Sequence, residues 1–108
     1  MTEIVVGEED RGRFIEAVQG SRVLLRLPEN PSTGYRWEVE TFEGDALKLQ
    51  TDTYQPPSII TLWAGGVRVV DFLAQSSGTV LLRLRLRRPW DPEDVAKAFE
   101  VTVHVTPH

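Results

Sequence analysis

Two histidines, His104 and His108, are the residues of this 108-residue chain best suited to acid–base or metal chemistry. A serine–histidine–carboxylate site needs a histidine held beside a serine and a buried carboxylate, and the spacing here suggests no such arrangement. His104 falls on the polar face of a predicted strand, and His108 is the last residue. The chain has no cysteine, hence no thiol nucleophile and no thiolate metal site. We therefore expect no catalytic residues, no metal and no cofactor.

The segment 30–37, which reads NPSTGYRW, has the composition of a stiff polar loop. Pro31 fixes its own φ at about −65°, and Gly34 permits a positive φ. The hydroxyls of Ser32 and Thr33 can bond back to the local backbone. The loop carries no reactive group, which favours recognition or occupation of a site over chemistry.

Two further loops are hard to explain as plain connections. In the segment 88–92, RPWDP, prolines flank Trp90 directly after the longest predicted strand. Trp90 either packs on the edge of the core or stands exposed as an anchor. The second alternative is considered because interfaces favour Trp, Tyr and Arg. In the segment 63–66, WAGG, the paired glycines form a simple bend or let backbone approach a neighbour closely.

Composition limits the classes of protein to consider. With 41% hydrophobic and 26% charged residues, the chain is predicted to form one globular domain over 1–108. The net charge of −4 disfavours nucleic-acid binding. No apolar run approaches the roughly 20 residues that span a bilayer, so we expect no membrane partner. The N-terminus shows no signal-peptide pattern, which favours the cytoplasm, and we expect a monomer.

Apolar residues alternate with polar ones along most of the chain, which predicts strands. The four clearest predicted strands are 22–27, 67–73, 80–88 and 99–106, and weaker ones are 3–6, 13–18, 47–54 and 59–62. A further alternation begins at Tyr35, where Trp37 is expected in the core. Many short strands separated by turn residues predict an all-β fold, an antiparallel sandwich of immunoglobulin-like character. One helical turn is expected at 91–94, where an aspartate precedes a proline.

Arginines recur along the strand 80–88 at positions that share one face. Arg83, Arg85 and Arg87, with the adjacent Arg88, form a basic stripe that could follow phosphates. The favoured alternative is a solvated face on which these arginines pair with glutamates of neighbouring strands. The candidate glutamates are Glu38, Glu40 and Glu100.

Taken together, the three loops resemble the chagasin-type inhibitors of papain-like cysteine proteases, inhibitor family I42. That family carries an Asn-Pro-Thr-Thr-Gly loop, a Gly-x-Gly-Gly loop and an Arg-Pro-Trp loop, in this order, on an immunoglobulin-like sandwich. The matching segments here are 30–34, 63–66 and 88–90. Two positions depart from the pattern: Ser32 replaces the commoner threonine, and Trp63 replaces the first glycine of the second loop.

The resemblance implies a reversible, tight-binding inhibitor that blocks the active-site cleft with loops 30–34, 63–67 and 88–91. The first loop would cover the catalytic cysteine of a cathepsin L-like or similar protease, and Trp90 would supply the main apolar contact. A thiolate nucleophile needs a carbonyl in near-attack geometry. A rigid loop that presents no such carbonyl would block the enzyme without being cleaved. The implied contact residues are Asn30, Pro31, Ser32, Thr33, Gly34, Gly65, Gly66, Arg88, Pro89 and Trp90.

A sandwich fold does not by itself decide the function. The alternative is an immunoglobulin-like module that binds another protein or a glycan through the same loops and inhibits no protease. An enzyme is the least favoured interpretation, and it would require turnover that depends on His104.

Overall fold

The computed structural model describes residues 2–41, 44–57 and 65–108, which form eight strands and two short 3₁₀ turns. The 3₁₀ turns are η1 (Glu8–Asp10) and η2 (Pro31–Thr33). The strands are β1 (Glu3–Gly7), β2 (Phe14–Val18), β3 (Arg22–Glu29), β4 (Arg36–Thr41), β5 (Leu47–Gln55), β6 (Gly66–Ala74), β7 (Gly78–Arg88) and β8 (Asp91–Thr106).

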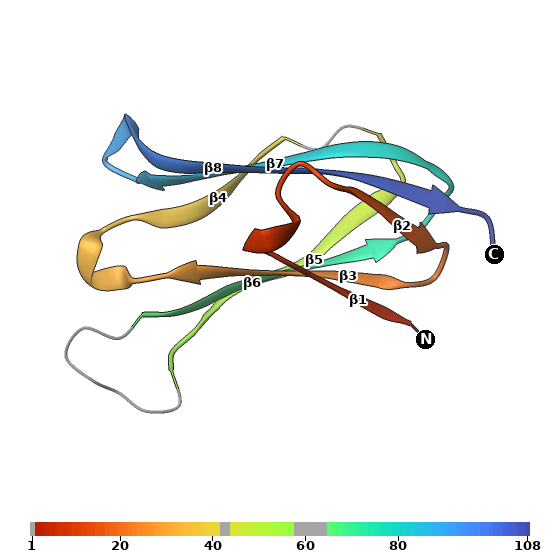
Figure 1. Ribbon diagram of the computed structural model, residues 1–108, viewed down its shortest axis with the longest axis horizontal. Helices are drawn as coiled ribbons and strands as arrows, with labels where there is room; N and C mark the ends of the chain where they lie inside the picture. The colour runs from red at the N-terminus through yellow and green to blue at the C-terminus, as the bar shows by residue number, and fades with distance from the viewer. Residues whose placement is uncertain (1, 42–43, 58–64) are drawn as a thin grey trace.

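The strands form two sheets that pack face to face (Figure 1). One sheet has the order β1-β3-β6-β5, and the other has the order β2-β8-β7-β4. Pairing is antiparallel except at two edges, where β1 runs parallel to β3 and β2 runs parallel to β8. The expected all-β sandwich is confirmed, and its N-terminal segment supplies one edge strand to each sheet.

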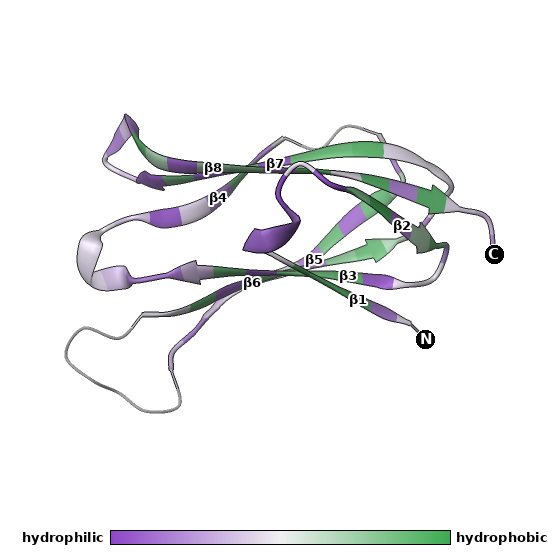
Figure 2. Cartoon of the chain, in the orientation of Figure 1, coloured by the Kyte–Doolittle hydropathy of each residue, from purple (hydrophilic) through white to green (hydrophobic). Residues whose placement is uncertain are grey.

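Alternation along the strands decides which side chains fill the space between the sheets (Figure 2). On β7, Val80, Leu82 and Leu84 are buried, while the alternate residues Leu81, Arg83 and Arg85 are exposed. Trp37 is also buried, and its ring meets Phe99 edge to face with centroids 6.5 Å apart. Burying such large apolar side chains is the main favourable term in holding two sheets together. The core position expected for Trp37 is confirmed.

The sequence-based strands agree with the structure to within a few residues, apart from β8, which begins well before the predicted 99–106. The weak candidate at 59–62 lies outside the described residues. The basic stripe on β7 is neutralised, as the favoured interpretation required. Its ion pairs are Arg83–Glu100 at 2.9 Å, Arg85–Glu40 at 2.7 Å and Arg87–Glu38 at 2.6 Å.

The predicted helical turn at 91–94 is wrong, because these residues open strand β8. Arg88 pairs with Asp91 across a two-residue turn, and the register then shifts so that Arg87 pairs with Val95. The Asp91 carboxylate does accept the local bond from the Glu93 amide, at 3.3 Å. An aspartate side chain can accept from the backbone amides of a turn as well as from those at the start of a helix. Here pairing with β7 makes the segment a strand.

The connections 30–35 and 89–90, which follow β3 and β7, lie at the end of the sandwich opposite the two termini (Figure 1). Strand β5 ends and strand β6 begins at this same end (Figure 1). The sheets therefore bring the first and third sequence-predicted loops to one end of the molecule, beside the strand ends that border the second. In the described part of the chain there is no helix with the length and apolar character needed to span a bilayer.

Candidate functional site

The first loop is held by its own polar side chains. Asn30 caps the turn η2, and its Oδ1 accepts from the amide of Ser32 at 3.1 Å and from its hydroxyl at 2.8 Å. Thr33 Oγ1 donates to the Asn30 carbonyl at 2.7 Å and accepts from the Tyr35 amide at 3.2 Å. Gly34 then reverses the chain with φ at +81°. The expected stiffness is confirmed, with both hydroxyls used inside the loop.

The third loop is a tight hairpin turn with Pro89 and Trp90 at its centre. Trp90 is 72% exposed, although it is one of the largest apolar side chains of the protein. Its ring reaches across to the first loop: a Cβ placed on Gly34 would lie 2.5 Å from Cη2 of Trp90. Gly34 is therefore needed for two reasons, its positive φ and the space that the indole occupies.

Arg88 joins the same two loops through polar contacts. Its Nε donates to the Thr33 carbonyl at 3.3 Å, and its Nη1 pairs with Asp94 Oδ2 at 3.0 Å. The guanidinium carbon lies 4.5 Å from the centre of the Tyr35 ring, a cation–π distance. The Tyr35 hydroxyl in turn donates to Asp94 Oδ1 at 2.8 Å. This hydrogen bond raises the pKa of Tyr35, burial adds to the rise, and the nearby Arg88 opposes it.

The glycine pair of the second loop packs against the protein itself. A Cβ on Gly66 would overlap the Gln55 carbonyl and lie 2.6 Å from the Tyr54 hydroxyl. Gly65 lies against the first loop, where a Cβ would be 3.0 Å from the Glu29 carbonyl. Gly66 is buried and Gly65 is exposed, so only Gly65 offers its backbone to a partner. Trp63 and Ala64 lie outside the described residues.

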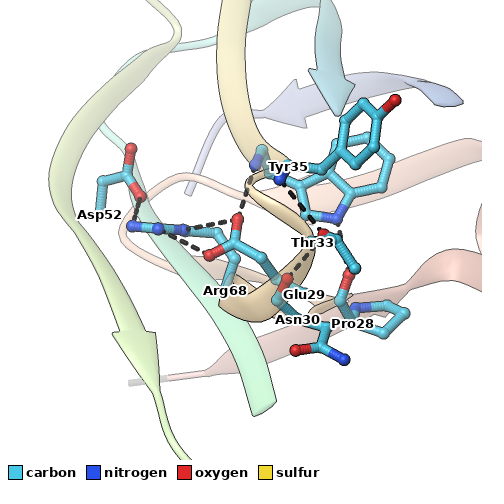
Figure 3. Close-up of polar contacts among 8 residues, drawn as sticks. Pro28, Glu29, Asn30, Thr33, Tyr35, Asp52 and Arg68 are labelled. Carbon is cyan, nitrogen blue, oxygen red and sulfur yellow. Dashed lines mark hydrogen bonds and ion pairs between the residues drawn. The ribbon is translucent and has the colours of Figure 1, made fainter. Parts of the chain in front are cut away.

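A buried ionic cluster under the first loop was missed by sequence reasoning. Glu29 forms an ion pair with Arg68, and Arg68 also reaches Asp52 (Figure 3). The available signal was an arginine within the mostly apolar segment 67–73. The Tyr35–Asp94 hydrogen bond beside Arg88 was also missed, because its two residues lie 59 positions apart in the sequence.

Two clefts flank the first loop. One, of about 400 Å³, is lined among others by Asn30, Thr33 and Gly65. The other, of about 330 Å³, lies between Pro31 and Trp90. The end of the sandwich is thus a central ridge with a hollow on either side, a shape suited to insertion into a groove.

The structure offers little for catalysis. His104 lies on the outer face of its sheet, where Nδ1 is 2.8 Å from the Thr79 hydroxyl and the ring stacks on Phe14 at 5.9 Å. A search of residues 2–41, 44–57 and 65–108 finds no group of three or more potential metal ligands.

Comparison with known proteins identifies the family. The profile of the family described as "Chagasin family peptidase inhibitor I42" matches residues 16–105, most of the chain. The chain belongs to the chagasin family of peptidase inhibitors. It is 31% identical to chagasin of Trypanosoma cruzi over 101 residues, which cover 89% of this chain and 92% of chagasin. It is 27% identical to amoebiasin-1 of Entamoeba histolytica over 100 residues, covering 91% and 95% of the two chains.

Solved structures agree with this assignment to the chagasin family. The cysteine protease inhibitor EhICP2 from Entamoeba histolytica superposes with a TM-score of 0.82 at 21% identity, covering 97% of this chain and 96% of that one. At that identity the likeness concerns the fold. Family membership confirms the expected peptidase inhibitor of the chagasin type and excludes the enzyme interpretation.

Proposed function

We propose that this chagasin-family chain inhibits papain-like cysteine proteases reversibly, by placing loops 30–34, 63–67 and 88–91 in the active-site cleft. The observation that carries the proposal is the contact between Trp90 and Gly34, which joins an exposed aromatic anchor to the first loop. Preformed loops lose little conformational entropy on docking. In this arrangement the first loop covers the catalytic cysteine, and the other two contact the walls of the cleft.

The hydrogen bonds of the first loop explain why a protease would not cleave it. The carbonyl of Asn30 accepts from Thr33, that of Pro31 accepts from the Gly34 amide at 3.0 Å, and that of Thr33 accepts from Arg88. A scissile carbonyl must instead be free to enter an oxyanion site and be attacked by the thiolate. A loop with these three carbonyls already engaged occupies the nucleophile's position and presents them poorly as a substrate.

We assign the contacts to the exposed members of the three loops. Ser32 and Thr33 lie nearest the cysteine, Trp90 provides the apolar anchor, and Gly65 offers its backbone. Gly66 and Arg88 support the loops from within the protein and lie behind the contact surface. The proposed inhibitor is a monomer with one domain over 1–108, and its location in the cytoplasm stays a prediction.

A direct test is titration of the purified protein into papain and a cathepsin L-like enzyme, with mass spectrometry of the inhibitor afterwards. We expect inhibition at or below micromolar concentration and an intact inhibitor. Absence of inhibition across the panel would reject the proposal, and binding to an unrelated protein or glycan would then favour a plain recognition module.

Trp90→Ala tests the anchor. Truncation of an interface anchor costs about 2 kcal/mol or more of binding free energy, which corresponds to a rise in the inhibition constant of roughly thirtyfold. The fold should be intact, since Trp90 is largely exposed. An unchanged inhibition constant in a folded variant would remove Trp90 from the interface.

A further inference from the structure

A chain of buried polar contacts lies beneath the first loop (Figure 3). The Glu29 side chain is 3% exposed. Its Oε1 accepts from the Trp37 amide at 2.6 Å and from Arg68 Nε at 3.2 Å. Its Oε2 pairs with Arg68 Nη2 at 2.7 Å, and Arg68 Nη1 reaches Asp52 Oδ1 at 3.3 Å.

The members of this chain stand at the bases of two loops. Glu29 ends β3 and Trp37 lies near the start of β4, so they border the first loop on both sides. Asp52 is on β5 and Arg68 is on β6, the strands that enter and leave the second loop. Because β3 and β4 belong to different sheets, the Glu29 carboxylate also ties the two sheets together at the loop end.

We propose that Glu29 and Arg68 are positioning residues that fix the first loop relative to strands β5 and β6, and that they thereby set the affinity for the protease. The inference rests on the proposed function, since it names a determinant of the same binding surface. Neither side chain touches the protease in this scheme. Both act through the backbone of the loops that they hold.

The chemistry of the pair suits positioning better than stabilisation. Desolvation offsets much of the attraction within a buried ion pair, so apolar side chains of similar volume often stabilise a fold equally well. A carboxylate facing a guanidinium gives directional, bidentate contacts that an apolar pair lacks. Here those contacts include a main-chain amide of the opposite sheet, so the geometry of the pair is transmitted to the loop backbone.

The same two strands supply a matched control at their other end. Asp71 on β6 has a side chain that is 7% exposed and pairs with Arg22 on β3, with Arg22 Nε 3.3 Å from Asp71 Oδ1. Arg22 also reaches Glu3 on β1 at 3.0 Å, so these contacts stay within one sheet. They lie at the end of β3 away from the loops, and a loss there affects stability without altering the binding surface.

The first experiment compares Glu29→Gln with Asp71→Asn, by chemical denaturation and by inhibition of papain at concentrations where each variant is folded. We expect both variants to lose stability, because each removes the more buried of the two carboxylates that pair with an arginine. We expect about a tenfold or larger rise in the inhibition constant for Glu29→Gln, since only a fraction of its loops is binding-competent. Asp71→Asn should stay within about twofold. Equal inhibition constants for the two variants would overturn the proposal.

Arg68→Met and the double variant Glu29→Gln/Arg68→Met complete a double-mutant cycle. If the two residues act as a unit, the double variant inhibits no more weakly than either single variant. It should nevertheless regain stability, because no uncompensated buried charge remains. Inhibition that recovers together with stability would make the pair purely structural and would contradict a positioning role.

Amide hydrogen exchange in the free protein provides a readout that needs no protease. The amides of Thr33 and Gly34 donate within the first loop, at 3.1 and 3.0 Å. Glu29→Gln should speed their exchange more than Asp71→Asn does. If the wild-type protein fails to inhibit, the proposed function falls, and unchanged exchange in Glu29→Gln would independently refute the positioning of the loop.

Discussion

At the scale of single residues, the proposed binding surface depends on side chains that stabilise the loop from within. Asn30 and Thr33 use their polar groups on neighbouring backbone, and Ser32 directs its hydroxyl to Asn30. The exposed surface of the first loop therefore presents a shape fixed before binding. Both hydroxyls of the loop are engaged in intramolecular hydrogen bonds.

Gly34→Ala should weaken inhibition more than its effect on stability would suggest. Alanine at a positive φ costs about 1–2 kcal/mol, and its methyl group would also displace the Trp90 ring. Gly20→Ala is the matched control, because Gly20 has φ at +96° and open space around the Cβ position. Denaturation and inhibition assays should show similar losses of stability but a raised inhibition constant for Gly34→Ala alone. Equal inhibition by both variants would contradict the role given to the Trp90–Gly34 contact.

At the scale of elements, a residue near the start of strand β8 makes contacts that hold the first loop. The register shift near its start places Asp94 where it can accept from Tyr35 and pair with Arg88. Arg88 and Asp94 lie on the two strands of the hairpin, while Tyr35 and Thr33 belong to the segment before β4. These contacts join the first loop to the third, and the Glu29–Arg68 pair links the end of β3 to strand β6.

Tyr35→Phe should lose less stability than the wild-type protein as the pH rises into the alkaline range. The hydrogen bond to Asp94 raises the pKa of the Tyr35 phenol in the folded protein, whereas the unfolded chain ionises near the ordinary value of about 10. The stabilisation is therefore complete below about pH 10 and is lost as pH rises through the higher folded pKa. Urea denaturation across this range should show wild-type stability falling toward that of Tyr35→Phe. Parallel curves of stability against pH for the two proteins would show that ionisation of the Tyr35 phenol is not coupled to folding.

At the scale of the whole molecule, the sandwich separates stability from recognition. The buried apolar side chains lie between the sheets, whereas Trp90 at the loop end is exposed. The outer arginines of β7 are paired with glutamates. A core of this kind can change in stability without altering the loops, as long as the strands keep their register.

Leu82→Ala tests this separation. Leu82 is completely buried in the middle of β7, and truncation of a buried leucine costs about 2–5 kcal/mol. Denaturation should show that loss, while the inhibition constant of the folded fraction should stay close to that of wild type. A large change in the inhibition constant would indicate that core packing and loop geometry are coupled along β7.

The sequence by itself determined the local features of this protein. Alternation along 80–88 and 99–106 predicted strands with a buried face, because the side chains of a strand point to opposite sides of the sheet. Proline at position 31 and glycine at position 34 predicted a stiff loop, because both restrict or permit φ locally. The loop motifs, in their order, then indicated the chagasin family, which the comparisons confirmed.

Only the tertiary structure decided how the loops are held. The capping pattern at 91–94 is satisfied equally well in a turn, and pairing with β7 made that segment a strand. Arg88 meets Thr33, Tyr35 meets Asp94 and Glu29 meets Arg68 across 39 to 59 residues of sequence. No local propensity encodes such contacts, because they depend on which strands become neighbours in space. The sequence thus named the loops, and the packing of the two sheets brought the first and third of them into contact.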